Sequence, residues 1–320
     1  MTTPTSRVYS PMLYIGETAA LATAVLWALT SIFFAEAGKR IGSFRVNSIR
    51  LLMAVGMYCI VLGLTRGHLL PPDLNREQFM WLALSGLVGL VFGDGCGFKA
   101  LVMIGPRLTT LMYAGAPVLA TVIAWIFLGE HLGVWAVVGI AVTISGISWV
   151  VLERRHKRNG PNDLGRSHPD AGSLRWGVLL GMGAALGQAA GLVMAKQGML
   201  HAGGVVEPLE ASLVRMMVAL VAIWLLAALR GELAYTLAAL KDGRALAFCG
   251  AGAVVGPFLG VWMSLVALKY IATGIAATLN SMTPVAIIPL VIRYYKEKVT
   301  LRAALGAVVA VGGVAILFLS

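Results

Sequence analysis

Long apolar segments separated by short polar ones run through most of the chain. Ten of these segments are about 20 residues long, enough for a helix to cross the hydrocarbon core of a bilayer. They lie at about residues 16–34, 44–64, 79–103, 108–128, 132–152, 174–196, 209–229, 245–268, 274–292 and 301–319. A polar tail occupies residues 1–15, and a basic linker at 153–173 divides the segments into two sets of five. The pattern predicts an all-α integral membrane protein with ten transmembrane helices.

The two sets of helices are related by an internal repeat. A constant separation of 167 residues relates Pro117 to Pro284, Glu130 to Glu297 and Gly139 to Gly306. Self-similarity at a fixed spacing over three successive segments is typical of a duplication. Because each set contains an odd number of helices, the two halves must lie in opposite orientations. We therefore expect an inverted 5+5 repeat, with one half at residues 16–152 and the other at 174–320.

The repeated motif resembles that of a known transporter family. Pro117-Val118, then Gly129-Glu130-His131-Leu132, then small residues through Gly139 and Gly146 are similar to the EamA-type repeat of the drug/metabolite transporter superfamily. The likeness covers nearly the whole chain, with one repeat in each half. It implies a ten-helix carrier, in a family that consists mostly of exporters of metabolites, amino acids or drugs. It also implies that the first, fourth, sixth and ninth helices line a central cavity.

Composition independently indicates a membrane protein. Apolar residues make up 59% of the chain and charged residues 12%, against about 45–50% and about 25% in soluble proteins. The net charge of +11 would suggest nucleic acid in a soluble protein, but here the basic residues lie between apolar segments. There they set the topology and contact lipid headgroups. We expect a cell-membrane protein, monomeric or weakly dimeric, with lipids and a small-molecule substrate as partners and no nucleic acid.

Lysine and arginine are distributed unevenly between the two sides of the predicted bundle. The linker at 153–173 and the connections on its side carry most of them. By the positive-inside rule, this distribution places the linker in the cytoplasm and both termini outside. The family resemblance implies the reverse, with both termini inside. We expect the orientation that the charge bias indicates.

The sequence contains no recognisable constellation for catalysis or for a cofactor. The 5 histidines are scattered over loops and helix ends, and neither an HExxH motif nor a GxxxxGK[ST] nucleotide-binding loop occurs. The 3 cysteines all lie within apolar segments and form no CxxC pair. We therefore expect a secondary carrier with no enzymatic activity, no cofactor and no metal. A lipid-carrier flippase is the alternative within the transport class, and an intramembrane enzyme is less favoured.

Asp94 is an ionisable residue deep in the third apolar segment, where a charge costs about 2.5–3.5 kcal/mol on insertion scales. Its neighbours are Gly93 and Gly95, and desolvation there disfavours the charged form. We expect Asp94 to face a wet cavity and to couple transport to protons. The alternative is a helix-packing partner held by lysine or arginine. Val261 occupies the equivalent position of the second half, so any coupling role is asymmetric.

Other polar and aromatic residues lie deep in the helices that the resemblance assigns to a cavity. Pro117 and Pro284 follow Tyr113 and Asn280 by one turn, and a proline within a helix frees a backbone carbonyl for a neighbour, a water or a ligand. The expected cavity residues are Trp27, Asp94, Tyr113, Pro117, Gln188, Asn280 and Pro284. Helix–helix hydrogen bonding is an equal alternative for the two amides, and packing alone is the alternative for the tryptophan. Such a weakly polar cavity with one acid fits amino acids, amphipathic metabolites or cationic drugs.

Four further charged residues occupy equivalent places in the two halves. Arg50 and Arg215 lie near the start of the second helix of each half, where we expect them to pair with a carboxylate or with carbonyls at the membrane boundary. Glu210 is the candidate partner of Arg215. Glu130 and Glu297 precede the fifth helix of each half and are expected to cap it. Binding of an anionic substrate by the arginines, or gating by the glutamates, is the less favoured alternative.

Overall fold

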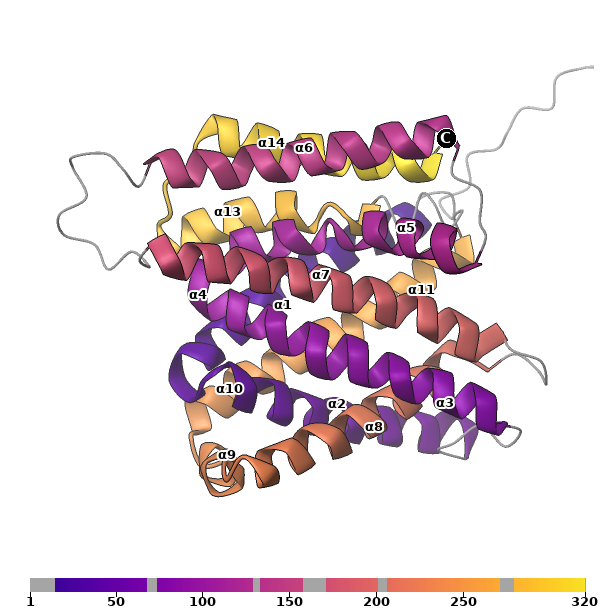
Figure 1. Cartoon of the computed structure of the whole chain (residues 1–320). Helices are drawn as coiled ribbons and strands as arrows, with labels where there is room; N and C mark the ends of the chain where they lie inside the picture. The colour runs from indigo at the N-terminus through magenta and orange to yellow at the C-terminus, as the bar shows by residue number, and fades with distance from the viewer. Residues whose placement is uncertain are drawn as a thin grey trace, which may run out of the picture.

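The computed structural model describes residues 15–67, 74–128, 133–157, 171–200, 206–270 and 279–319. Every regular element in these ranges is helical, and most of the helices run side by side (Figure 1). The elements are α1 (Ile15–Ile41), α2 (Ser43–Arg66), α3 (Arg76–Ser85), η2 (Gly86–Gly93), α4 (Asp94–Tyr113), α5 (Ala116–Leu128), α6 (Val134–Lys157), α7 (Ala171–Leu200), α8 (Pro208–Leu229), α9 (Leu233–Ala239), α10 (Gly243–Ala253), η3 (Val254–Gly260), α11 (Val261–Tyr270), α13 (Thr283–Tyr295) and α14 (Leu301–Leu319).

The helices have the length and composition of membrane spans. In the described part of the chain, 7 helices are long and apolar enough to cross a bilayer, and two shorter apolar ones lie near the C-terminus. One of the 7, Arg76–Tyr113, kinks at Gly105, whose φ of 81° lies in the left-handed region that favours glycine. α4 therefore holds the end of the third predicted helix and the start of the fourth. The expected all-α membrane fold with ten helices is confirmed.

The third helix of each half contains a π-helical segment, which the sequence analysis did not predict. η2 ends at Gly93 and η3 at Gly260, two positions that the repeat relates. Asp94 follows η2 directly, and Val261 follows η3. A π-helical turn is wider than an α-helical one and occurs frequently at functional sites. The duplication has thus kept a backbone irregularity next to the asymmetric acidic position.

The fourth helix of each half is interrupted just before its proline. Two residues in turn conformation precede α5 and two precede α13, so Pro117 and Pro284 lie in the first turn of a new helix. The prolines are therefore not in the middle of a helix as expected, and a first-turn proline leaves no intrahelical hydrogen bond unmade. The carbonyl of Asn280 accepts a hydrogen bond from the Thr283 hydroxyl at 3.0 Å. Paired interruptions of this kind are typical of transporters with inverted repeats.

Helices from the two halves alternate in the packing. α1 packs against α10, η3 and α11 of the second half, while α7 packs against α3, η2 and α4 of the first. The first helix of each half therefore contacts the third helix of the other, as an inverted repeat requires. α6 and α14 pair with each other along one edge of the bundle, and α2, α8 and α9 lie at the opposite edge (Figure 1). Side chains from α1, α2, α4, α7 and α8 all reach the interior between the halves.

One end of the bundle is held together by polar contacts between the halves. This is the end at which α1 ends and α14 begins, on the left in Figure 1. The contacts are Arg40–Asp242 at 3.1 Å, Arg45–Glu232 at 3.7 Å, Arg107–Glu297 at 2.8 Å and a hydrogen bond from Tyr295 to Glu36 at 2.6 Å. At the other end, Arg66 lies 3.6 Å from Glu207. Most of the described ion pairs between the halves therefore lie at a single end.

Candidate functional site

A cavity of about 510 Å³ lies between the two halves of the molecule. Side chains from α1, α2, α4, α7 and α8 contribute to its wall, together with residues around the breaks before α5 and α13. The structure brings all seven expected cavity residues to this wall: Trp27, Asp94, Tyr113, Pro117, Gln188, Asn280 and Pro284. Residues that are far apart in the sequence and belong to both repeats therefore share one chamber.

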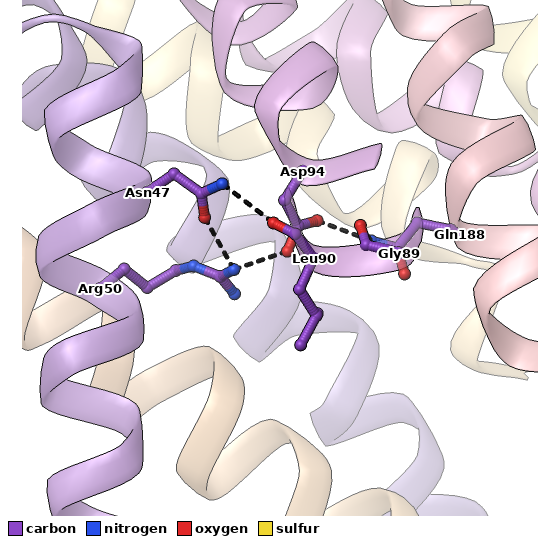
Figure 2. A network of polar contacts seen from close by, with 6 residues as sticks. All are labelled: Asn47, Arg50, Gly89, Leu90, Asp94 and Gln188. Atoms are coloured by element: carbon purple, nitrogen blue, oxygen red, sulfur yellow. Dashed lines mark hydrogen bonds and ion pairs between the residues drawn. The ribbon is translucent and has the colours of Figure 1, made fainter. Parts of the chain in front are cut away.

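Asp94 is the centre of a buried polar network in the cavity wall (Figure 2). Its Oδ2 accepts a hydrogen bond from Nη2 of Arg50 at 2.6 Å, and its Oδ1 accepts one from Nε2 of Gln188 at 2.6 Å. The same Arg50 nitrogen donates to Oδ1 of Asn47 at 2.9 Å, and the Asn47 amide donates to the carbonyl of Leu90 at 2.9 Å. Both carboxylate oxygens are therefore engaged, and the network joins α2, η2, α4 and α7.

Close backbone contact between η2 and α7 positions Gln188. A Cβ on Gly93 would lie 3.1 Å from the backbone carbonyl carbon of Gly187, closer than most side chains tolerate. Glycine at both positions lets the two helices approach without side chains between them. The Gln188 amide can then reach Asp94 and also donates to the carbonyl of Gly89 at 3.3 Å. Of the two alternatives for this amide, helix–helix hydrogen bonding is present in the structure, and the residue also lines the cavity.

Arg50 forms a buried ion pair in the wall of the cavity. Its side chain is 5% exposed and that of Asp94 is 12% exposed. The guanidinium also lies over the ring of Phe98, with 5.2 Å between its carbon and the ring centroid. The arginine has a carboxylate partner, and it lines the cavity from the eighth residue of α2. Arg50 is therefore the basic partner that the helix-packing alternative for Asp94 requires.

Arg215 also lines the cavity. A Cβ atom added at Gly89 would lie only 3.3 Å from Nη2 of Arg215. The glycine in η2 therefore leaves room for the guanidinium. The expected partner Glu210 instead lies 3.7 Å from Arg66. Among the described residues, none forms an ion pair with Arg215, and its Nε is buried without a hydrogen-bond partner. The two equivalent arginines are thus both in the chamber, but only Arg50 is neutralised by a contact.

Glu297 does not cap the last helix as expected. Its Oε1 accepts a hydrogen bond from Nε of Arg107 at 2.8 Å, which ties the halves together. At the start of α14, the Thr300 hydroxyl accepts from the backbone N–H of Ala303 at 3.2 Å and takes the capping role. The repeat-equivalent Glu130 lies outside the described residues.

Several lining residues were missed by the sequence analysis. Thr30, Ser31 and Phe34 follow Trp27 by three, four and seven residues, so they lie on the same face of α1. The sequence signal that could have identified them is their helical spacing from Trp27, which was already an expected cavity residue. Tyr58, whose hydroxyl donates to the carbonyl of Pro257 at 3.3 Å, had no such signal.

The charge of the chamber differs from the expectation of a weakly polar cavity with one acid. The charged lining residues in the described part of the chain are Arg50, Asp94 and Arg215, so the wall carries one net positive charge. The described residues contain no group of three or more histidine, cysteine or acidic side chains that could hold a metal. The arrangement can therefore bind a polar molecule through charge and hydrogen bonds. It offers no set of metal ligands in this region.

Comparison with known proteins gives two kinds of match. Residues 14–152 and 175–319 each match the EamA-like transporter family, so the two matches together cover most of the chain. A solved crystal structure of a protein is similar to this chain over 95% of its length and over 96% of that structure's chain, with a TM-score of 0.53 and 20% sequence identity. A likeness at that identity shows the fold alone. No curated protein sequence matches the chain.

Proposed function

Because the chain belongs to the EamA-like transporter family and is therefore an integral membrane transporter, we propose that it is a secondary carrier that exports a small metabolite, amino acid or drug. The observation that carries the proposal is the chamber of about 510 Å³ between two inverted halves, with a charged network in its wall. Sites at the interface between inverted repeats, built around interrupted helices, are where secondary transporters bind their substrates. The breaks before Pro117 and Pro284 supply such helices here.

Alternating access would require the contacts at one end of the bundle to break. In the structure, Arg107–Glu297 and Arg40–Asp242 join the two halves at the end where α14 begins. When the halves rock against each other, these pairs separate and the chamber opens on that side. The family's inverted architecture allows the two halves to exchange roles in this motion.

We propose in addition that Asp94 couples export to protons. The carboxylate is held by Arg50 and Gln188 while it is charged. Binding of one proton to this carboxylate would remove its negative charge and weaken its attraction to the guanidinium. Arg50 would then be free to take another partner, which links protonation to a rearrangement of the chamber wall. Asp94 would thus be the counter-ion of a buried arginine in one state and a proton carrier in the other.

An efflux screen tests the proposed export. Cells that produce the protein and cells that carry an empty vector are loaded with a panel of amino acids, toxic analogues and amphipathic drugs. We expect at least one chemical class to leave the producing cells faster. Equal efflux from both cell types over the whole panel would contradict the proposal.

A further inference from the structure

We infer that Arg215 binds a carboxylate of the substrate, so that the transported molecule is an organic carboxylate with an apolar or aromatic body. The inference rests on the proposed function, because it assigns a substrate class to the same chamber. From the sequence alone, binding of an anionic substrate by the arginines was the less favoured alternative. The structure favours it for Arg215. Four features of the chamber support it.

The first feature is the charge balance of the wall. Arg50 and Arg215 face one carboxylate, that of Asp94, among the described lining residues. Asp94 lies 2.6 Å from Arg50, so this pair is neutral as a unit. Arg215 is attracted to the same carboxylate, but no ion pair between the two is formed, so its guanidinium has no contacting counter-ion among the described residues. A cation within a membrane protein normally pairs with an anion or with carbonyls, and an anionic substrate would supply the missing charge.

The second feature is that the chamber offers no free acid to a cationic ligand. One oxygen of Asp94 accepts from Arg50 and the other from Gln188, both at 2.6 Å. An ammonium group entering the chamber would have to displace one of these donors while lying near Arg215. A carboxylate that binds at Arg215 displaces neither of these donors. The chamber therefore favours an anionic group over a cationic one, which argues against the cationic drugs that the sequence left open.

The third feature is the geometry of Arg215 itself. Its Nε is buried without a hydrogen-bond partner among the described residues, and its Nη2 lies beside Gly89 of η2, where no side chain intervenes. A guanidinium presents its N–H groups as a planar fork that matches the two oxygens of a carboxylate. An unpartnered buried donor is costly, and a ligand that accepts hydrogen bonds would remove that cost.

The fourth feature is the aromatic lining of the same chamber. Five aromatic residues contribute to the wall, namely Trp27, Phe34, Tyr58, Phe98 and Tyr113. They surround a volume of about 510 Å³, which is within the range of small-molecule sites. Small-molecule sites usually have mostly apolar walls with a few polar groups. The apolar wall buries the body of the ligand, and the polar groups orient it through its charge. An aromatic monocarboxylate matches both parts of this wall.

The test uses four compounds that share a phenyl ring on a short chain and differ in charge. They are 3-phenylpropionate and phenylalanine, which carry a carboxylate, and 3-phenylpropionamide and 3-phenylpropylamine, which do not. The midpoint of thermal unfolding of the full-length protein in detergent is measured with each compound over a concentration series. We expect a carboxylate-bearing compound to raise the midpoint and the neutral amide and the amine to leave it unchanged.

Variants of the arginine locate the effect. Arg215→Gln should weaken the apparent affinity for the effective carboxylate at least about tenfold, because a charge-assisted hydrogen bond is lost. Arg215→Lys, which keeps the charge but not the planar fork, should retain part of the affinity. Arg244→Gln is the matched control, since it removes an exposed arginine from outside the chamber and should bind like the parent.

Three outcomes would overturn the inference: no stabilisation by either carboxylate, equal stabilisation by the amide or the amine, or unchanged affinity in Arg215→Gln. If that variant does not fold, the comparison of the four compounds on the parent protein still decides. Failure of the proposed function looks different, because then no compound of any charge leaves cells faster when the protein is present. Export of amines with no preference for carboxylates would retain the transporter and reject only the role of Arg215.

Discussion

Nη2 of Arg50 lies 2.6 Å from Oδ2 of Asp94, in the wall of the chamber between the two halves. The pair joins α2 to the residue that directly follows the π-helical segment η2. Both side chains are largely buried, so neither charge is well solvated by water. The repeat places an arginine in the second half as well, but no acid at Val261. The ion pair therefore marks where the two otherwise similar halves differ in chemistry.

We predict that Asp94→Asn lowers stability by about 3–5 kcal/mol, because removal of one partner leaves the other charge buried and unpaired. The double variant Arg50→Gln/Asp94→Asn should recover about half of the loss or more, since neither charge remains. The measurement is the midpoint of thermal unfolding in detergent.

Glu207→Gln is the matched control: its partner Arg66 lies 3.6 Å away, but Glu207 is 55% exposed. Such an exposed pair contributes at most about 1 kcal/mol. Equal midpoints for Asp94→Asn and the parent would rule out a stabilising ion pair.

The same double variant should transport without coupling to protons. It lacks both the protonatable carboxylate and the arginine that the carboxylate holds, while its fold is retained. In vesicles with an imposed pH gradient, the parent should accumulate the substrate identified by the efflux screen, whereas the double variant should only equilibrate it. Exchange of labelled for unlabelled substrate without a gradient serves as the control for folding. Gradient-driven accumulation by the double variant would exclude Asp94 as the coupling group.

A third prediction concerns the contact between Arg107 and Glu297, which joins the halves at 2.8 Å. Arg107→Glu and Glu297→Arg should each lower the unfolding midpoint, and the charge-swapped double variant should recover part of the loss. We expect a coupling energy of about 0.5–3 kcal/mol from this cycle, because the two side chains are partly buried. Strictly additive losses would show that the pair contributes nothing.

The pair Arg40–Asp242 provides the matched comparison for that cycle. It also joins the two halves, at 3.1 Å, but the side chains are 41% and 28% exposed. Its coupling energy should lie in the range of exposed pairs, about 0.2–1 kcal/mol.

A fourth prediction concerns orientation in the membrane. A reporter fused after Ser320 should be on the non-cytoplasmic side, and one inserted near Asn162 should be in the cytoplasm, because lysine and arginine are concentrated on the side of the linker. Paired reporters, one active only in the cytoplasm and one only outside, make the measurement. Cytoplasmic activity of the Ser320 fusion would reverse this orientation and agree with the one that the family resemblance implies.

The sequence predicted the buried acidic residue and six other residues of the chamber wall. Asp94 was recognisable because a carboxylate in a long apolar segment has few structural reasons to be there. Tyr113 and Asn280 were recognisable because the repeat relates them and places each one turn before a proline. The sequence places Arg50 near the start of its helix but does not show that its side chain lines the chamber, because distance from the end of an apolar segment does not reveal how far a long side chain reaches into the bundle.

Backbone irregularities were beyond the reach of the sequence pattern. η2 and η3 differ from α-helices by a wider turn, which changes no hydrophobic period that a sequence could show. The helix breaks before Pro117 and Pro284 depend on how the preceding two residues pack, so the prolines indicated the place but not the geometry. The short helix α9 has only 7 residues and lies between the predicted helices 209–229 and 245–268.

We propose that the substrate passes through the chamber between the halves, and a side chain that fills the chamber should block this route. Ser31 lines the chamber from α1, whereas Val25 on the same helix is 45% exposed on the outside of the protein. The measurement is the rate at which the substrate from the efflux screen leaves proteoliposomes containing the parent, Ser31→Trp or Val25→Trp. We predict that Ser31→Trp abolishes efflux while Val25→Trp keeps the parental rate, with all three proteins folded. A parental rate in Ser31→Trp would show that the substrate takes another path.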